Sequence, residues 1–273
     1  MLGKLLKYEF KATQRTFLPL FGLILVFAGI NKLFMQLNFQ HVNGATSVAM
    51  GAVLTIYIVL IVAVFVMTLI VTIQRFQKNL LSDEGYLSFT LPVKVHSHID
   101  AKMIASLVWS ILSVIVAGLS ALILVADRNT FPLIGRFFRG LGEYTRNYGG
   151  MGWLIVGELI VLALISTLTG ILQIYNSMAV GNLCSRHKLL ASFGTFLGFG
   201  ILQQIIASII IGGWYGSEKF WDDLFHNIDR FTNWQAMNMI ASVLGIVILF
   251  VALFGVAFYF FTDWLLSKKL NLE

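Results

Sequence analysis

The chain has 273 residues, of which 58% are apolar and only 12% are charged, and its mean hydropathy is +0.84. Because a soluble domain carries about 25% charged residues, this composition excludes a water-soluble globular protein and predicts an integral membrane protein. The net charge of +6 lies in short segments between apolar runs. That pattern is typical of cytoplasmic loops facing anionic lipid and argues against nucleic-acid binding. A single cysteine, Cys184, excludes an intrachain disulfide.

The first segment, MLGKLLKYEFKATQRT (1–16), has the pattern of an amphipathic helix. Helical spacing separates a basic stripe from an apolar side: Lys4, Lys7, Lys11 and Arg15 against Leu2, Leu5, Leu6 and Phe10. Such a helix lies in the interface of the inner leaflet. The basic side chains before the first apolar run also predict that no leader is cleaved. Glu9 falls on the apolar side, where it either reaches sideways to water or contacts a partner protein.

Six segments are apolar over the roughly 20 residues that a membrane span needs. They are residues 17–35, 48–73, 103–126, 151–180, 189–211 and 236–266. Inside lipid every backbone polar group needs an internal partner, so these segments must be helices. The sequence therefore predicts an all-α, polytopic protein with one transmembrane domain, without a soluble domain or an internal repeat.

The basic residues predict the orientation of the spans, because cytoplasmic loops are enriched in lysine and arginine. If both termini are cytoplasmic, 12 of the 19 basic residues lie inside: Lys4, Lys7, Lys11, Arg15, Arg75, Lys78, Lys94, Lys102, Arg186, Lys188, Lys268 and Lys269. The sequence thus predicts a multi-pass protein of the cell membrane with extracellular loops at 127–150 and 212–235. The spacing of Ile134, Phe137, Phe138 and Leu141 predicts a short helix on the outer surface.

The longest cytoplasmic loop, residues 74–102, is predicted to contain a short helix. Pro92 disfavours helix at the residue before it, and Ser97 with Asp100 resembles a capping box that starts the third span. A helix between Arg75 and Phe89 would expose apolar surface that requires a cover. Two adjacent acids, Asp83 and Glu84, suit an anionic leaflet poorly, so the pattern favours a protein partner.

Polar residues within the spans give further candidates. Glu158 is the one acid well inside a span, and it either marks a translocation path or reaches the nearby outer interface. Gly194 and Gly198 form a G-x-x-x-G pair that fits a dimer contact or packing within one subunit. Four amides are candidates for hydrogen bonds between helices: Gln173, Asn176, Gln203 and Gln204.

Catalytic and metal sites have little support in the sequence. His96 and His98 lack a third ligand nearby, so we interpret them as residues of a solvated turn. Cys184, beside Arg186 and His187, fits a short inner loop better than an activated thiol. The spans lack the nucleophile and base pairs that an intramembrane enzyme requires, so we expect no enzyme activity and no metal.

The run RFQKNLLSDEGYLSFTLPV (75–93) resembles the loop between the second and third spans of the permease subunits of bacterial ABC exporters. These permeases form the type-2 exporter family, whose fold is also called type V. The matching positions are Arg75, Asn79, Asp83, Glu84, Gly85, Tyr86, Leu91 and Pro92. The surface helix, the six spans and the excursion at 212–234 fit the same resemblance, whereas Ser88 and the two histidines look like variable positions.

The resemblance implies that this loop forms a coupling helix that docks on a separate ATPase. The expected ATPase-coupling residues are Asn79, Leu80, Asp83, Glu84, Gly85, Tyr86, Leu87 and Phe89. The chain lacks the G-x-x-x-x-G-K-[ST] phosphate loop, so ATP and Mg²⁺ would bind the ATPase, and this chain would need no cofactor. A second permease copy and two ATPase chains would complete the exporter, with the first and fifth spans near the dimer axis.

The resemblance also implies a substrate. The related permeases export amphipathic peptides such as bacteriocins or phenol-soluble modulins. A lining with few charges suits such peptides, lipids and hydrophobic drugs alike, so a lipid or drug exporter of the same family is an alternative. A membrane-bound immunity or scaffold protein with no transport cycle is the alternative from another class.

Overall fold

The computed structural model describes residues 2–37, 44–81, 95–125, 131–184, 186–215 and 233–268. Within these ranges the chain is helical and contains no strand, which confirms the predicted all-α class. The chain divides into two compact units, Met1–Phe137 and Phe138–Glu273.

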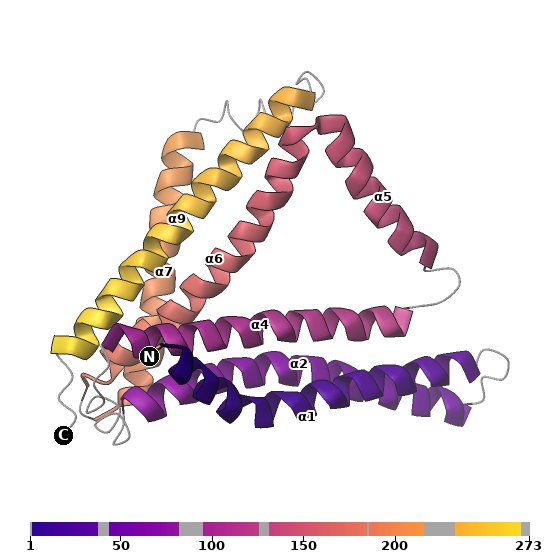
Figure 1. Ribbon diagram of the computed structural model, residues 1–273, viewed down its shortest axis with the longest axis horizontal. Helices are drawn as coiled ribbons and strands as arrows, with labels where there is room; N and C mark the ends of the chain where they lie inside the picture. The colour runs from indigo at the N-terminus through magenta and orange to yellow at the C-terminus, as the bar shows by residue number, and fades with distance from the viewer. Residues whose placement is uncertain are drawn as a thin grey trace. The chain divides into compact units, whose positions relative to one another are not determined.

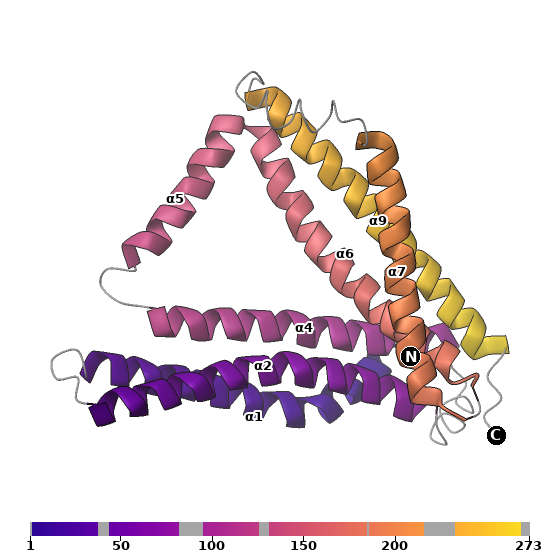
Figure 2. The ribbon, with the colours of Figure 1, turned by 180° about the vertical axis from the view of Figure 1, so that it is seen from behind.

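Unit 1 consists of three long helices that lie side by side (Figures 1 and 2). They are α1 (Leu2–Leu37), α2 (Gly44–Leu80) and α4 (Val95–Val125), and each contacts the other two. Both views place the start of α1, the end of α2 and the start of α4 at the same end of the unit. Residues of the predicted cytoplasmic loop therefore connect two helices at the end where the chain begins.

Aromatic and aliphatic side chains form the core of unit 1. Helical spacing in α1 turns four residues to one side, and they pack on residues of α2 and α4: Phe17, Phe21, Ile24 and Ala28 against Tyr57, Val64 and Trp109. The rings of Phe17 and Trp109 are stacked, with centroids 4.5 Å apart and an interplanar angle of 11°. Such aromatic pairs contribute about 0.5–1.5 kcal/mol beyond the area they bury. Trp109 therefore joins α4 to α1 through its ring.

Hydrogen bonds between side chains and neighbouring helices extend along the rest of unit 1. Tyr57 Oη lies 3.0 Å from Ser120 Oγ, and both groups are buried. Asn31 Nδ2 donates to the Val53 carbonyl at 3.2 Å. Polar bonds of this kind join helices in lipid, where apolar burial alone supplies no drive for association.

Unit 2 contains α6 (Gly150–Gly181), α7 (Lys188–Tyr215), α9 (Asn233–Lys268) and the end of α5 (Phe131–Tyr148). The central helix is α6, which contacts both α7 and α9. Hydrogen bonds cross these contacts: Thr169 Oγ1 donates to the Val251 carbonyl at 3.1 Å, Gln173 Nε2 to the Phe196 carbonyl at 3.2 Å, and Thr195 Oγ1 to the Ser177 carbonyl at 3.1 Å. The Tyr144 hydroxyl on α5 donates to Met237 Sδ of α9 at 3.0 Å.

The prediction of six spans is confirmed at the level of length and composition. Among the described residues, six helices are long and apolar enough to cross a membrane, and each covers one predicted span to within one residue. The chain therefore has the character of a multi-pass membrane protein. The predicted helix in the loop 127–150 is present as α5, in which Phe138 is exposed.

The main differences from the predicted boundaries lie in unit 1. The segment 1–16 does not form a separate helix, because α1 continues from Leu2 through Leu37 with Pro19 inside it. Figure 1 shows that the first part of α1 runs at an angle to the rest. Proline removes a helical hydrogen bond and its ring crowds the preceding turn, which is a recognised cause of such kinks. The predicted surface segment and the first span are therefore two parts of one kinked helix.

The predicted cytoplasmic loop is shorter than expected at both ends. The helix α2 continues past residue 73 to Leu80, so Arg75 and Asn79 are helical. The helix α4 begins at Val95, which places Ser97 inside the first turn and not at a cap. Residues 82–94, which carry most of the predicted coupling helix, lie outside the described residues.

Candidate functional site

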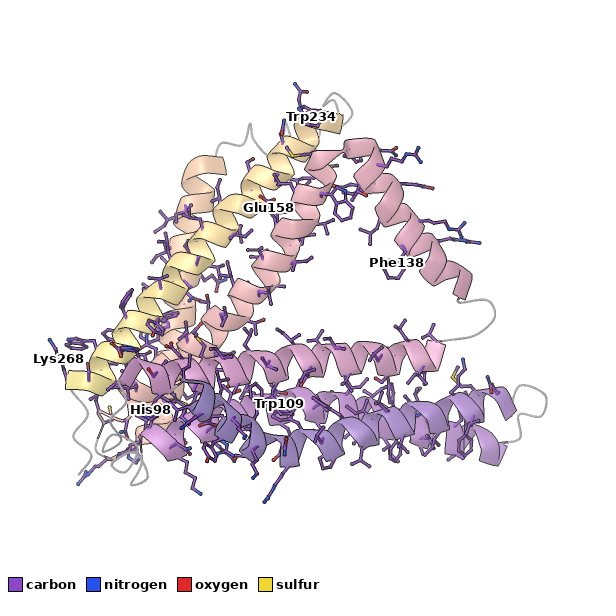
Figure 3. All side chains as sticks on the ribbon, viewed as in Figure 1. His98, Trp109, Phe138, Glu158, Trp234 and Lys268 are labelled. Carbon is purple, nitrogen blue, oxygen red and sulfur yellow. The ribbon has the colours of Figure 1, made fainter. Side chains whose placement is uncertain are left out.

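The candidate site is the end of unit 1 to which the loop 82–94 is attached. We define the base of unit 1 as residues 9–17 of α1, 71–81 of α2 and 95–109 of α4. Figure 3 shows Trp109 among the three helices and His98 close to the start of α4. Charged and hydroxyl side chains gather in this region between apolar segments.

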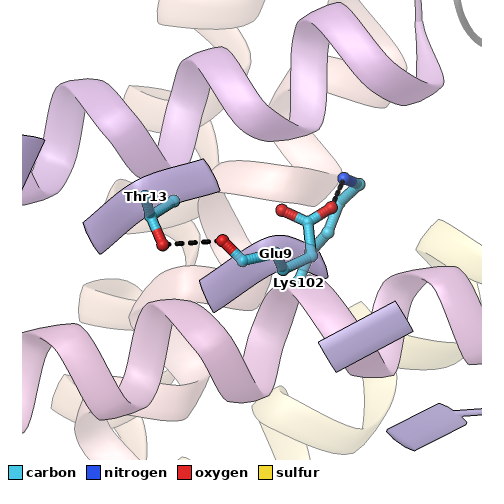
Figure 4. Close-up of polar contacts among 3 residues, drawn as sticks. All are labelled: Glu9, Thr13 and Lys102. Carbon is cyan, nitrogen blue, oxygen red and sulfur yellow. Dashed lines mark hydrogen bonds and ion pairs between the residues drawn. The ribbon is translucent and has the colours of Figure 1, made fainter. Parts of the chain in front are cut away.

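An ion pair joins the first part of α1 to the start of α4. Lys102 Nζ donates to Glu9 Oε1 at 2.5 Å (Figure 4). The side chains are largely buried, with 4% of Lys102 and 14% of Glu9 exposed. Glu9 is therefore paired within the chain and does not reach sideways to water, whereas its contact with a partner protein stays a prediction. Charged groups in apolar surroundings pair because the low dielectric makes an isolated charge costly.

Thr13 connects the same two helices one turn farther along α1. Its Oγ1 donates to the Glu9 carbonyl at 2.8 Å (Figure 4) and accepts a hydrogen bond from Trp109 Nε1 at 2.7 Å. The indole of Trp109 also stacks on Phe17. We call these four contacts, among Glu9, Thr13, Phe17, Lys102 and Trp109, the α1–α4 brace. The brace fixes the start of α1 to the segment of α4 that follows the loop.

A polar groove lies beside the brace, between α1 and α2. Its volume is about 290 Å³, and it is lined by Ala12, Thr13, Thr16, Val71, Gln74, Arg75, Lys78 and Asn79. The basic stripe predicted for the first segment is exposed, as Lys4, Lys7, Lys11 and Arg15 all face away from the helix contacts. The surface of the base of unit 1 is therefore basic, and its interior contains the Glu9–Lys102 ion pair.

The predicted coupling residues divide into two groups. Asn79 is half-buried and lines the groove, whereas Leu80 is fully buried within the chain. The others lie outside the described residues: Asp83, Glu84, Gly85, Tyr86, Leu87 and Phe89. The burial of Leu80 means that it supports the end of α2, and an anchor for a partner has to come from the remainder of the loop.

The structure disagrees with the sequence interpretation of His98 and agrees with that of Cys184. His98 does not belong to a solvated turn, because it is buried in the first part of α4. Cys184 is exposed in the turn after α6, in agreement with a short loop. Within the described ranges, no group of three histidine, cysteine, aspartate or glutamate side chains could hold a metal ion.

Glu158, the candidate for the translocation path, lies on the side of α6 that faces α9 (Figure 3). Its Oε1 would be 3.7 Å from a Cβ built on Gly245, and its Oε2 is buried without a hydrogen-bond partner in the described chain. The side chains of Asn176 on α6 and Thr262 on α9 are likewise buried and unsatisfied there. Of the four predicted bridging amides, Gln173 makes a bond between helices in the described part of the chain.

Gly194 and Gly198 face open space on α7. A Cβ built on either residue meets no atom of the described chain within 4 Å. Neither glycine of this G-x-x-x-G pair therefore packs closely on another described helix of unit 2, and packing within one subunit is still a prediction. The dimer contact stays a prediction.

Comparisons with known proteins give no family assignment. No family model, no curated protein and no solved structure matches the chain.

Proposed function

We propose that the chain is the permease subunit of an ATP-driven exporter. In this proposal two copies form a path for a hydrophobic or amphipathic substrate, with an amphipathic peptide as the substrate class. A separate ATPase binds ATP and Mg²⁺, and the loop 82–94 transmits its movement to the spans. The resemblance of residues 75–93 to coupling loops supports this proposal, as does the presence of six apolar helices.

The α1–α4 brace is the observation that carries the proposal. A coupling loop is useful only if its movement reaches membrane-spanning helices without being lost in local bending. Here the loop enters α4, and the buried Glu9–Lys102 pair and the Thr13–Trp109 hydrogen bond fix α4 to α1 within the next turns. Because charged and hydrogen-bonded partners in apolar surroundings separate only at high cost, displacement of the start of α4 would move α1 with it.

The loop supplies suitable contact residues for an ATPase. Tyr86, Leu87 and Phe89 are the aromatic and large apolar side chains that typically form the buried centres of protein interfaces. Leu80 is left out of this set, since it is already fully buried in the chain. Asp83 and Glu84 would pair with basic residues of the ATPase and set the orientation of docking.

The test is a double substitution in the loop, Tyr86→Ala with Leu87→Ala, in the full chain coexpressed with the ATPases encoded in its own genome. Loss of an interface anchor costs about 2 kcal/mol or more, roughly thirtyfold in affinity. We expect the variant to insert in the membrane normally and to lose the copurifying ATPase, or to separate ATP hydrolysis from export.

The control is Phe138→Ala with Leu141→Ala on α5, which removes a similar amount of apolar surface on the predicted outer side. It is expected to retain the ATPase. If the wild-type chain binds no ATPase, the immunity or scaffold alternative replaces the exporter. If the loop variant binds ATPase and exports substrate normally, the coupling assignment of this loop is wrong.

A further inference from the structure

The groove between α1 and α2 combines several donor groups in a small volume. Its described lining contains the guanidinium of Arg75, the ammonium of Lys78, the side-chain amides of Gln74 and Asn79, and the hydroxyls of Thr13 and Thr16. No acidic residue is among these lining residues. A volume of about 290 Å³ is close to the lower limit of roughly 300 Å³ for ligand pockets, enough for a small anionic group.

Arg75 is the central cation of this groove. It is half-buried, and within the described chain it makes no ion pair; the nearby carboxylate of Glu9 is bound to Lys102 instead. A partly buried guanidinium without a counter-charge is unfavourable unless a ligand or ordered solvent compensates it. Its planar fork of five donors matches the oxygens of a phosphate group and binds them bidentately. Among its described lining residues, the groove therefore has no negative charge opposite Arg75, and a phosphate would supply one.

The surroundings of the groove favour a phosphate attached to an acyl chain. Beyond the groove, at helical spacing from its lining residues, the two helices carry apolar side chains: Leu23 of α1 is 46% exposed and Met67 of α2 is half-buried. Both helices are candidate spans. Lys11 and Arg15, which are neighbours in sequence of the lining residues Ala12 and Thr16, are exposed and add positive potential. Such a change from basic to apolar side chains follows the order of groups along a phospholipid.

We propose that this groove binds the phosphate group of an anionic phospholipid, with Arg75 as the principal ligand and Thr16 as a hydroxyl donor. The acyl chains lie along the apolar faces of α1 and α2. The site differs from the general attraction of the basic stripe to anionic lipid because it requires one side chain at one position. It is also independent of the exporter proposal, since it makes no use of an ATPase.

The experiment measures lipid binding to the purified full chain by native mass spectrometry in detergent. Phosphatidylglycerol is titrated against the wild type, Arg75→Gln, Arg75→Lys and Thr16→Val, with phosphatidylcholine as the reference lipid. We expect Arg75→Gln to weaken the first binding event of phosphatidylglycerol by at least tenfold. Arg75→Lys should weaken it less, because it keeps the charge and loses the fork, and Thr16→Val should have a smaller effect of the same sign.

The matched control is Lys7→Gln, which removes one exposed charge of the basic stripe. One basic residue near an anionic surface accounts for about a fivefold change or less. Equal effects of Arg75→Gln and Lys7→Gln would overturn the proposal, because binding would then be general surface attraction. The comparison is valid only if Arg75→Gln and Lys7→Gln unfold at similar temperatures. If Arg75→Gln does not fold, weaker phosphatidylglycerol binding by Arg75→Lys and Thr16→Val tests the proposal in its place.

A second binding experiment distinguishes a site for a phospholipid from a site for free phosphate. Inorganic phosphate is added to the wild-type chain in place of the lipid, and its binding is compared with that of phosphatidylglycerol. We expect no retention of inorganic phosphate at concentrations that saturate the lipid site. Retention of inorganic phosphate that Arg75→Gln abolishes would show a site for a soluble anion and would overturn the lipid assignment.

Discussion

At the scale of single residues, the buried charges of unit 1 are its most consequential feature. The sequence places Glu9 on the apolar side of a helix, but it does not identify the partner, because Lys102 is 93 positions away. The sequence predicts only that Lys102 is one of the basic residues on the cytoplasmic side. Because charges inside apolar segments tend to pair with one another, Glu9 and Lys102 are possible partners. Whether they meet depends on how the three helices pack, which the sequence does not give.

The Glu9–Lys102 pair gives a prediction about stability. Glu9→Gln leaves the Lys102 ammonium buried without its counter-charge, which typically costs about 3–5 kcal/mol. We expect a clear fall in the unfolding temperature of the purified chain in detergent. The double variant Glu9→Gln with Lys102→Met should recover most of the loss, since an apolar replacement of a buried pair is often neutral.

Glu143→Gln, at an exposed position of α5, is the control and should change stability by about 0.5 kcal/mol or less. A Glu9→Gln effect as small as this control would mean that water reaches the pair. It would also remove the brace from the argument for coupling.

At the scale of helices, composition predicts where the spans lie but not where the helices end. Apolar runs identify all six segments because lipid requires both length and low charge. Arg75 to Leu80 are polar enough to read as a loop, yet they contain no glycine or proline, and α2 continues through them. In α1 the helix likewise continues through Pro19, so the predicted surface segment and the first span belong to one helix.

The contact between α6 and α7 depends on one small residue. A Cβ on Gly181 would lie 2.7 Å from the Ser192 Cα, a backbone atom that cannot rotate away. Gly181→Ala should therefore push the start of α7 outward and destabilise unit 2 by about 1–3 kcal/mol, measured as a lower unfolding temperature. Gly170→Ala on the same helix meets nothing within 4 Å and should gain up to about 1 kcal/mol from helix propensity. Equal behaviour of the two variants would show that α7 does not approach α6 this closely.

At the scale of the whole molecule, the orientation of the spans is the first quantity to measure. Cys184 is exposed and is predicted to be cytoplasmic. An impermeant maleimide should therefore leave it unlabelled in intact cells and label it after permeabilisation. A cysteine at the exposed Glu143, introduced in a Cys184→Ser background, should react in intact cells. The reverse pattern would place both termini outside.

The open glycines of α7 give a prediction about assembly. Gly194→Leu with Gly198→Leu should reduce the yield of cross-linked dimer without lowering the stability of the monomer, because both positions face open space. Gly118→Leu, at an open position of α4, is the control and should leave the dimer yield unchanged. An unchanged yield of cross-linked dimer in the α7 variant would mean that Gly194 and Gly198 do not lie at the contact between permease copies.

The division into two units that are each continuous in sequence has a consequence for biogenesis. All residues of unit 1 are synthesised before the first residue of unit 2. At about 5–20 residues per second, translation of the second half takes on the order of ten seconds. The Glu9–Lys102 pair and the Trp109 stack can therefore close while the nascent chain is still in the translocon. Glu9 and Lys102 would then be paired before the second half is inserted. Two coexpressed halves of the chain, divided near Phe137, should therefore reassemble in the membrane.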